Sequence, residues 1–304
     1  MIVLDGGLAT ELEARGHDLS DELWSARLLA DAPGEIVAVH EAFFRAGAQV
    51  ATTASYQASF EAFAARGFGR RETEDLLRRS VALAAEARSR VEGPRWIAAS
   101  VGPYGAMLAD GSEYRGRYGL SAARLTAFHR PRIEVLAEAG PDLLALETVP
   151  DVDEAVAMLA ALEGADVPAW LSYTITGDRT RAGQPLEEAF AVAAGRDDVL
   201  AVGVNCCDPE DAARAIPLAR EVSGKPVVAY PNSGEGWDAV RRRWTGRSRF
   251  APDRVINADA AGGCCRIGPA AIAALAASCV GETPGRGLSQ NPGGNFPTIP
   301  RSVG

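Results

Sequence analysis

The sequence predicts an α/β fold of the (β/α)8 (TIM) barrel class, built as a single domain. Eight short apolar runs alternate with amphipathic helical stretches along the 304 residues. The runs are continuously apolar, which is typical of parallel strands buried on both faces. An open, doubly wound sheet is the alternative, but no G-x-G-x-x-G follows the first run, so its dinucleotide-binding version has no support.

The first half of the chain holds four of the predicted strands. The first strand is short and ends at Asp5-Gly6-Gly7. The helix that follows it places Ile36, Val39 and Phe43 on one side, at the spacing of an amphipathic helix. The predicted strands are residues 2–4, 49–53, 96–101 and 143–146, and the predicted helices are 35–46, 71–91, 121–139 and 153–162.

The second half continues the alternation but contains the least regular strand. The predicted strands are residues 169–173, 200–204, 227–230 and a segment within 255–261, and the predicted helices are 187–194, 209–222 and 269–277. The last strand includes Ala258-Asp259-Ala260-Ala261, whose small residues and acid are poor strand formers. We therefore assign residues 1–280 to the barrel and expect the Gly- and Pro-rich residues 281–304 to form an irregular tail.

Composition excludes several classes of partner. A net charge of −9 argues against a nucleic-acid binder, and no apolar run approaches the ~18 residues of a membrane helix. The start of the chain lacks the basic and long apolar regions of a signal peptide, and the odd cysteine count does not suggest a disulfide framework. We expect a cytoplasmic protein that acts on small molecules. The sequence carries no signal for its oligomeric state.

The cysteines give the sharpest chemical signal. Cys206 follows the sixth predicted strand, and Cys264 and Cys265 follow the eighth, so all three should meet at the end of the barrel that carries active sites. Zinc binds thiolates tetrahedrally, and a catalytic zinc keeps one position open. Gly262-Gly263 offers the backbone freedom for two consecutive cysteines to face one metal.

Other interpretations of the cysteines fit less well or remain open. Burial as small apolar residues suits Cys207 and Cys279. A thiol redox protein is not supported because the chain contains no C-x-x-C. A barrel whose zinc is purely structural remains an alternative. A lysine-based aldolase is disfavoured because Lys225, the only lysine, precedes the seventh strand at the opposite end of the barrel.

Two acids share the predicted end of the barrel. Asp5 ends the first strand and Glu147 ends the fourth. A carboxylate there can bind an ammonium group or act as a base. Asp5 could instead form a turn before its glycines, whereas Glu147 needs a partner because it directly follows an apolar run.

Over about residues 3–275 the chain resembles the homocysteine S-methyltransferase family, a family of zinc-binding barrels. The pairing of Asn205-Cys206 with Gly262-Gly263-Cys264-Cys265 is the most specific part. The weak eighth strand departs from the family, which usually has an apolar run there. The other matching motifs are Leu4-Asp5-Gly6-Gly7, Asp21-Glu22-Leu23-Trp24-Ser25-Ala26, Thr52-Thr53-Ala54-Ser55-Tyr56-Gln57-Ala58, Ser100-Val101-Gly102-Pro103-Tyr104-Gly105, Leu146-Glu147-Thr148 and Tyr230-Pro231-Asn232-Ser233-Gly234-Glu235.

The resemblance implies a function and a set of site residues. It implies Zn²⁺ on Cys206, Cys264 and Cys265, and a homocysteine whose amino group is held by Asp5 and Glu147. It also implies an amino-acid pocket lined by Thr53 and Ser55. Homocysteine would fill the open zinc position and be methylated to methionine.

The methyl donor is predicted from two motifs and from aromatic residues. Gly111-Ser112-Glu113-Tyr114 and Tyr230–Glu235 resemble the branch that uses S-methylmethionine or S-adenosylmethionine. Both donors are sulfonium cations, which aromatic faces attract. The donor-binding candidates are Trp24, Tyr56, Tyr104 and Asn232. Betaine or methylfolate as donor, and another thiol or a selenol as acceptor, remain alternatives.

Overall fold

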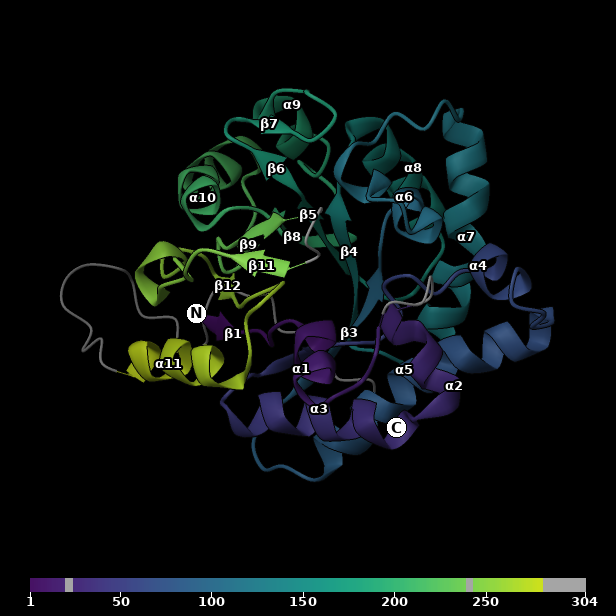
Figure 1. Ribbon diagram of the computed structural model, residues 1–304. Coiled ribbons are helices and arrows are strands. Elements are labelled where there is room, and N and C mark those ends of the chain that lie inside the picture. The colour runs from purple at the N-terminus through teal and green to yellow at the C-terminus, as the bar shows by residue number, and fades with distance from the viewer. Residues whose placement is uncertain (20–23, 239–242, 281–304) are drawn as a thin grey trace.

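The structure, a computed structural model, describes residues 1–19, 24–238 and 243–280, and it confirms the predicted barrel. Eight parallel strands lie at the centre of the molecule with helices around them (Figure 1). A parallel bridge between Leu4 and Val50 joins the first and last strands of the sheet, so the barrel closes. In sheet order the strands are β1 (Ile2–Val3), β12 (Ala260–Ala261), β9 (Val227–Tyr230), β8 (Val199–Asn205), β5 (Ala169–Tyr173), β4 (Leu143–Val149), β3 (Trp96–Val101) and β2 (Val50–Thr52).

The outer layer consists of the helices that connect these strands. Side chains cap several of them; for example, Ser121 accepts from the N–H of Arg124, and Asp208 accepts from that of Glu210. The helices are α1 (Leu8–Ala14), α2 (Leu28–Asp31), α3 (Pro33–Arg45), α4 (Phe60–Ala64), α5 (Arg70–Ser89), α6 (Tyr104–Leu108), α7 (Ala122–Glu138), α8 (Val152–Leu162), α9 (Leu186–Ala191), α10 (Pro209–Ser223) and α11 (Pro269–Val280).

Short elements complete the connections. They are the 3₁₀ helices η1 (Trp24–Arg27), η2 (Ser112–Tyr114) and η3 (Pro252–Arg254), and the two-stranded sheets β6–β7 (Ile175–Thr176, Arg179–Thr180) and β10–β11 (Gly236–Asp238, Arg243–Thr245). Among the described residues, no helix is both long enough and apolar enough to cross a membrane.

The interior of the barrel is apolar toward the amino ends of the strands and polar toward their carboxyl ends. Its apolar layer contains Trp170 on β5 together with alanines of the two neighbouring strands, Ala145 and Ala201, which leave room for the indole ring. Side chains alternate along a strand, so the inward positions that follow these residues face the same interior, nearer the carboxyl ends. Those positions are polar: Thr52, Ser100, Glu147, Ser172, Asn205 and Tyr230.

The eighth strand is real but shorter than the predicted segment 255–261. Only Ala260 and Ala261 pair, with β9 on one side and β1 on the other. The acid that made this segment a poor strand lies just before it: Asp259 accepts hydrogen bonds from the N–H of Val227 at 2.8 Å and from Arg220 at 2.6 Å. Its carboxylate therefore ties β9 and α10 together. The predicted tail, residues 281–304, lies outside the described residues.

Candidate metal and substrate site

A cavity at the carboxyl ends of the strands brings the three predicted metal ligands together. The sulfur atoms of Cys206, Cys264 and Cys265 all lie within 4.8 Å of one another, and those of Cys206 and Cys265 are 3.6 Å apart. Tetrahedral zinc with Zn–S bonds near 2.3 Å needs sulfur atoms roughly 3.8 Å apart. The three thiols therefore fit a zinc ion. Among the described residues, the group has no fourth Cys, His, Asp or Glu member.

Cys206 occupies an unusual backbone conformation at the end of β8. Its φ of 50° lies in the left-handed region, which non-glycine residues rarely adopt. The N–H of Cys206 donates to the carbonyl of Tyr230 at 3.1 Å, and its carbonyl accepts from Thr174 at 3.1 Å. These bonds hold the turn that aims the sulfur into the cavity. The next residue, Cys207, lies instead in the core between the strands and helices.

The turn that carries Cys264 and Cys265 is fixed by loops from neighbouring strands. The N–H of Cys264 donates to the carbonyl of Pro231 at 2.8 Å, and the N–H of Cys265 donates to the Asn232 side chain at 3.0 Å. Each backbone amide of the pair thus has a partner in the loop after β9. The left-handed residue of this turn is Arg266, with a φ of 68°.

The two glycines before the cysteines serve close packing rather than backbone freedom, which corrects the sequence-based interpretation. Neither has a positive φ. A Cβ at Gly262 would lie 2.5 Å from the carbonyl oxygen of Asp5, and one at Gly263 would lie 2.2 Å from the Ile267 side chain. The chain after β1 therefore packs directly on the backbone that leads to the metal ligands.

The cysteine cluster favours a thiolate, the form in which cysteine binds metals. Hydrogen bonds from Cys206 and Cys264 hold the pKa of Cys265 well below its ordinary value. The hydroxyl of Tyr114, in η2, lies 3.0 Å from the sulfur of Cys206. The motif Gly111–Tyr114 is recognisable in the sequence, but no role for Tyr114 itself is predicted from it.

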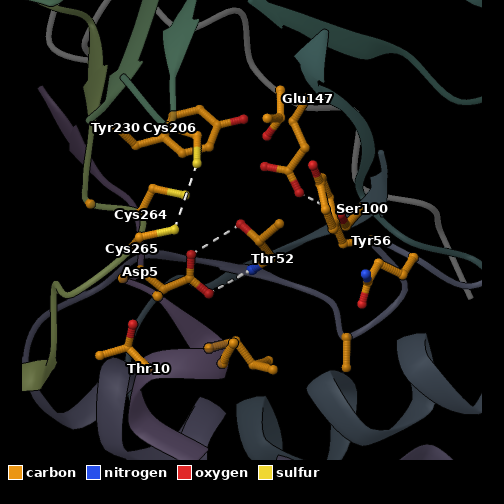
Figure 2. Close-up of a pocket in the computed structure, with 18 of the residues that line it drawn as sticks. Asp5, Thr10, Thr52, Tyr56, Ser100, Glu147, Cys206, Tyr230, Cys264 and Cys265 are labelled. Atoms are coloured by element: carbon orange, nitrogen blue, oxygen red, sulfur yellow. Dashed lines mark hydrogen bonds between the residues drawn. The ribbon is translucent and has the colours of Figure 1, made fainter. Parts of the chain in front are cut away.

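Two buried carboxyl groups, those of Asp5 and Glu147, line the same cavity as the cysteines (Figure 2). Asp5 accepts from the N–H of Thr52 at 2.7 Å and from its hydroxyl at 3.0 Å. Glu147 accepts from the hydroxyl of Ser100. Burial raises the pKa of Asp5 to about 8 and that of Glu147 to about 7. A cationic ligand would offset that cost and stabilise the carboxylate forms.

A buried asparagine, the last residue of β8, couples the strand β4, which contains Glu147, to the strand that precedes Cys206. Asn205 Oδ1 accepts from the N–H of Thr148 at 2.7 Å and from Ser172 at 2.9 Å, while its Nδ2 donates to the Thr148 hydroxyl at 2.8 Å. Thr148 is itself left-handed, with a φ of 57°. This amide fixes the spacing between a carboxyl group and a metal ligand, a role that spacing in the sequence does not reveal.

The two predicted pocket hydroxyls lie at different depths. Thr53 lines the cavity, whereas Ser55 lies behind it and is not part of the lining. The Ser55 hydroxyl donates to the carbonyl of Ser100 at 2.7 Å, so the Thr53 hydroxyl donates to Ser55 and accepts from the N–H of Ser100. Ser55 thus supports Thr53 from behind.

The predicted donor-binding residues also differ in whether they line the cavity. Tyr56 lines the cavity. Tyr104 does not: its ring packs 4.9 Å from that of Phe128, between α6 and α7. The side chain of Asn232 holds the backbone of Cys265. The side chain of Trp24 lies outside the described residues.

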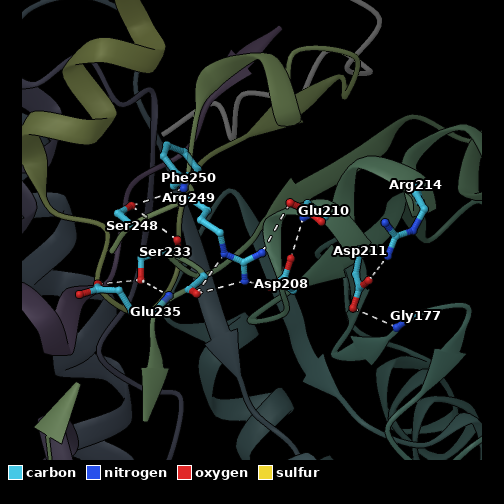
Figure 3. A network of polar contacts seen from close by, with 11 residues as sticks. Gly177, Asp208, Glu210, Asp211, Arg214, Ser233, Glu235, Ser248, Arg249 and Phe250 are labelled. Carbon is cyan, nitrogen blue, oxygen red and sulfur yellow. Dashed lines mark hydrogen bonds and ion pairs between the residues drawn. The ribbon is translucent and has the colours of Figure 1, made fainter. Parts of the chain in front are cut away.

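An arginine clamps the outer side of the cysteine loops (Figure 3). The guanidinium of Arg249 binds Asp208, and lies 3.5 Å from Glu210, at the start of α10. It also donates to the carbonyl of Gly234 at 3.1 Å. Asp208 follows Cys206-Cys207, and Gly234 lies in the loop that holds Cys264 and Cys265. Arg249 therefore connects the segment after β8, which contains Cys206, to the loop after β9, which holds Cys264 and Cys265.

Comparison with known proteins agrees with this geometry. The family model described as homocysteine S-methyltransferase matches residues 2–279. Homocysteine S-methyltransferase 4 of Zea mays is 47% identical over 300 residues, which cover 90% of this chain and 88% of that protein. The selenocysteine methyltransferase of Astragalus bisulcatus is 41% identical over 303 residues, which cover 89% of this chain and 90% of that protein.

A solved structure shares both sequence and fold with this chain. The crystal structure of the homocysteine methyltransferase MmuM from Escherichia coli, in a metallated form, has a TM-score of 0.81 and 43% sequence identity. The match covers 91% of this chain and 96% of that one.

Proposed function

The chain belongs to the homocysteine S-methyltransferase family and is a methyltransferase; from this premise we propose that it methylates homocysteine with a sulfonium donor, S-methylmethionine or S-adenosylmethionine, at a zinc site. The proposed zinc ligands are Cys206, Cys264 and Cys265. The observation that carries the proposal is that these three sulfur atoms lie within 4.8 Å of one another and face a cavity lined by carboxyl groups.

The metal, when bound, supplies a Lewis acid that holds the acceptor sulfur in its nucleophilic thiolate form. The protein groups then place the reactants. Asp5 and Glu147 bind the acceptor's ammonium group, and Thr53 lines the pocket beside them. The acceptor sulfur attacks the methyl carbon, the bond from that carbon to the donor sulfur breaks, and its electron pair stays on the donor, which leaves as a neutral thioether. Positioning of this kind supplies several kcal/mol of the barrier reduction.

Tyr56 is the donor-binding candidate that lies on the cavity wall, where its ring can face a sulfonium cation. Selenocysteine is a second candidate acceptor, because a relative with 41% identity is named a selenocysteine methyltransferase. A selenol has the same chemistry as a thiol in this site, so it needs no different arrangement of residues.

The test is a donor and acceptor matrix with metal analysis. Purified protein is assayed with homocysteine or selenocysteine against S-methylmethionine, S-adenosylmethionine, betaine and 5-methyltetrahydrofolate, with zinc content measured on the same samples. We expect turnover with a sulfonium donor in zinc-loaded protein. Turnover with betaine or methylfolate alone would contradict the proposed donor, and no turnover with either acceptor would contradict the proposed reaction.

A further inference from the structure

The cavity contains one more carboxyl group than the acceptor requires. Three acidic side chains line it, those of Asp5, Glu147 and Glu113, and no Lys, Arg or His among the described residues does so. Asp5 and Glu147 suffice for one ammonium group. The third acid has no assigned counterpart, and a second cationic ligand would stabilise it in its carboxylate form.

Glu113 is buried on the cavity wall, and one of its two carboxyl oxygens has no hydrogen-bond partner among the described residues. Its side chain is 3% exposed, and the oxygen without a partner is Oε2. Within the described part of the chain, the carboxyl group of Glu113 bonds only to its own backbone N–H. The other two acids differ, because Asp5 accepts from Thr52 and Glu147 accepts from Ser100. A buried carboxyl oxygen without a hydrogen bond is costly, and a ligand bound in the cavity would remove that cost.

The fold holds Glu113 in place without using its carboxyl group. Its backbone lies against Gly105, where an added Cβ would come within 2.4 Å of the Glu113 nitrogen. The preceding residue, Ser112, is fixed by a hydrogen bond from its N–H to Asp110 at 2.9 Å. The next residue, Tyr114, contacts Cys206. The segment η2 is therefore anchored at both ends, and the carboxyl group is free to bind a ligand.

Of the other buried polar atoms without hydrogen bonds, Gln57 Oε1 also belongs to a residue that lines the cavity, but its amide carries no charge. Glu154 Oε2 and Arg132 Nε are also without partners, but they belong to oppositely charged residues of one closed cluster. Neither residue lines the cavity. Glu113 combines burial, the absence of a cationic partner and a place on the cavity wall.

We propose that Glu113 binds the positive charge of the methyl donor and selects a cationic S-methyl sulfonium over a neutral or anionic donor. This inference rests on the proposed function, since it assigns the second substrate of the same site. Tyr114, the residue after Glu113, lines the same wall of the cavity, and its hydroxyl contacts the sulfur of the proposed zinc ligand Cys206. A donor bound at Glu113 therefore lies beside the zinc site and the acceptor sulfur held there.

The proposal predicts which kinetic constant changes. An interaction made equally in the bound donor and in the transition state affects KM and leaves kcat unchanged. If the carboxylate faces the sulfonium itself, its contribution weakens as the methyl group leaves, so kcat again does not fall. Hydrogen bonds to charged groups correspond to a change of about 10- to 100-fold in KM.

The experiment compares Glu113→Gln with Glu147→Gln in zinc-loaded protein, with homocysteine as acceptor and S-methylmethionine as donor. Glutamine keeps the size and removes the charge. We expect E113Q to raise the donor KM about 10- to 100-fold with the homocysteine KM within about 2-fold of wild type. E147Q should instead raise the homocysteine KM and leave the donor KM close to that of wild type. The melting temperature of E113Q should not fall, because the native carboxyl group bonds only to its own backbone N–H among the described residues, a hydrogen bond that the glutamine side-chain oxygen can keep.

A second donor, dimethylsulfoniopropionate, separates the two charges of S-methylmethionine, because it is a sulfonium without an ammonium group. It is measured as a substrate or, without turnover, as a competitive inhibitor. A loss of affinity in E113Q for both compounds places Glu113 at the sulfonium and supports the proposal. A loss for S-methylmethionine alone places Glu113 at the ammonium group and contradicts the selection of a sulfonium.

The outcomes that overturn this inference differ from those that overturn the proposed function. An active wild type whose E113Q variant keeps its donor KM contradicts the role of Glu113 alone. A fall in melting temperature with equal rises in both KM values would show a structural role and also contradict it. A wild type that uses no sulfonium donor contradicts the proposed function itself.

Discussion

Two buried polar clusters of this barrel differ in how their charges are balanced. Behind the turn after β3, Arg132 donates to His129 Nδ1 at 2.7 Å, and His129 Nε2 lies 3.0 Å from Glu154. Arg132 also donates to the carbonyl of Gly102, and Glu154 accepts from the N–H of Tyr104 at 2.6 Å. This cluster contains one cation and one acid, and it fixes the turn above it.

The cavity contains the opposite arrangement. Its acids and thiols face one another without a cationic side chain among the described lining residues. Burial lowers the pKa of His129 well below its usual value, so the imidazole in the first cluster is neutral and the charges there match. Buried charge that is paired within the protein supports the fold here, whereas the buried acids that lack a cationic side chain lie where we propose that a metal ion and cationic substrates bind.

The largest effect should come from the cysteine cluster. Cys264→Ser replaces a thiolate that completes the three-sulfur site, and we expect it to lose bound zinc and to lower methyl transfer by about 1,000-fold or more. Metal analysis and the homocysteine assay measure the two effects on the same sample. Cys279→Ser, whose sulfur lies on α11 away from the cluster, is the matched control and should retain both.

A substitution in the cluster of Arg132, His129 and Glu154 should lower the stability of the fold. Arg132→Met leaves Glu154 without its cation and frees the carbonyl of Gly102, so the free energy of unfolding should fall by about 3 kcal/mol. Urea unfolding at fixed zinc concentration measures it. Arg124→Met, on the exposed side of the same helix, is the control. Equal stabilities for the two variants would mean that the cluster does not support the fold.

The same cluster predicts a pH dependence. Burial raises the pKa of Glu154 to about 7 from 4.5, so the folded protein binds a proton between these values that the unfolded chain releases. The contribution of Glu154 to stability is therefore largest below pH 4.5 and is lost as the pH rises to 7. Relative to Glu154→Gln, wild type should lose about 1 kcal/mol of unfolding free energy per pH unit in this window. A difference independent of pH would show that Glu154 is ionised throughout.

The smallest expected effect tests the contact between a tyrosine and a metal ligand. Tyr114→Phe removes one hydrogen bond to the sulfur of Cys206. Zinc affinity should fall about 10-fold, since partners that orient metal ligands contribute at that level. Competition with a chromogenic chelator measures the affinity. An unchanged affinity would show that the backbone bonds of Cys206 position its sulfur without the tyrosine.

The sequence predicts well what repeats along the chain or stands at the end of a strand. The alternation of apolar runs predicts the barrel, and the positions of Cys206 and Glu147 after apolar runs predict that both face the cavity, although β4 extends past Glu147 to Val149. The short eighth strand also follows from its small residues, although its bounds do not. These features depend on local pattern and on one general rule of barrel geometry.

Features that depend on contacts between distant segments could not be predicted. Asn205 bonds to Thr148, 57 positions earlier in the chain, and Arg249 reaches Asp208 across a loop. Glu113 and Tyr114 lie in a short 3₁₀ helix with no periodic pattern, so nothing local shows that they reach the cavity. Tyr104, an aromatic residue after a strand, packs against helices because the turn after β3 directs its ring outward.

The most direct test of the central claim is a zinc titration of the wild-type enzyme. Protein stripped with a chelator is assayed for methyl transfer from S-methylmethionine to homocysteine as zinc is added back in known equivalents. We predict no turnover in the stripped protein and recovery that saturates at about one zinc per chain, since the three sulfur atoms form one site. Full activity in protein shown to contain no metal would contradict it.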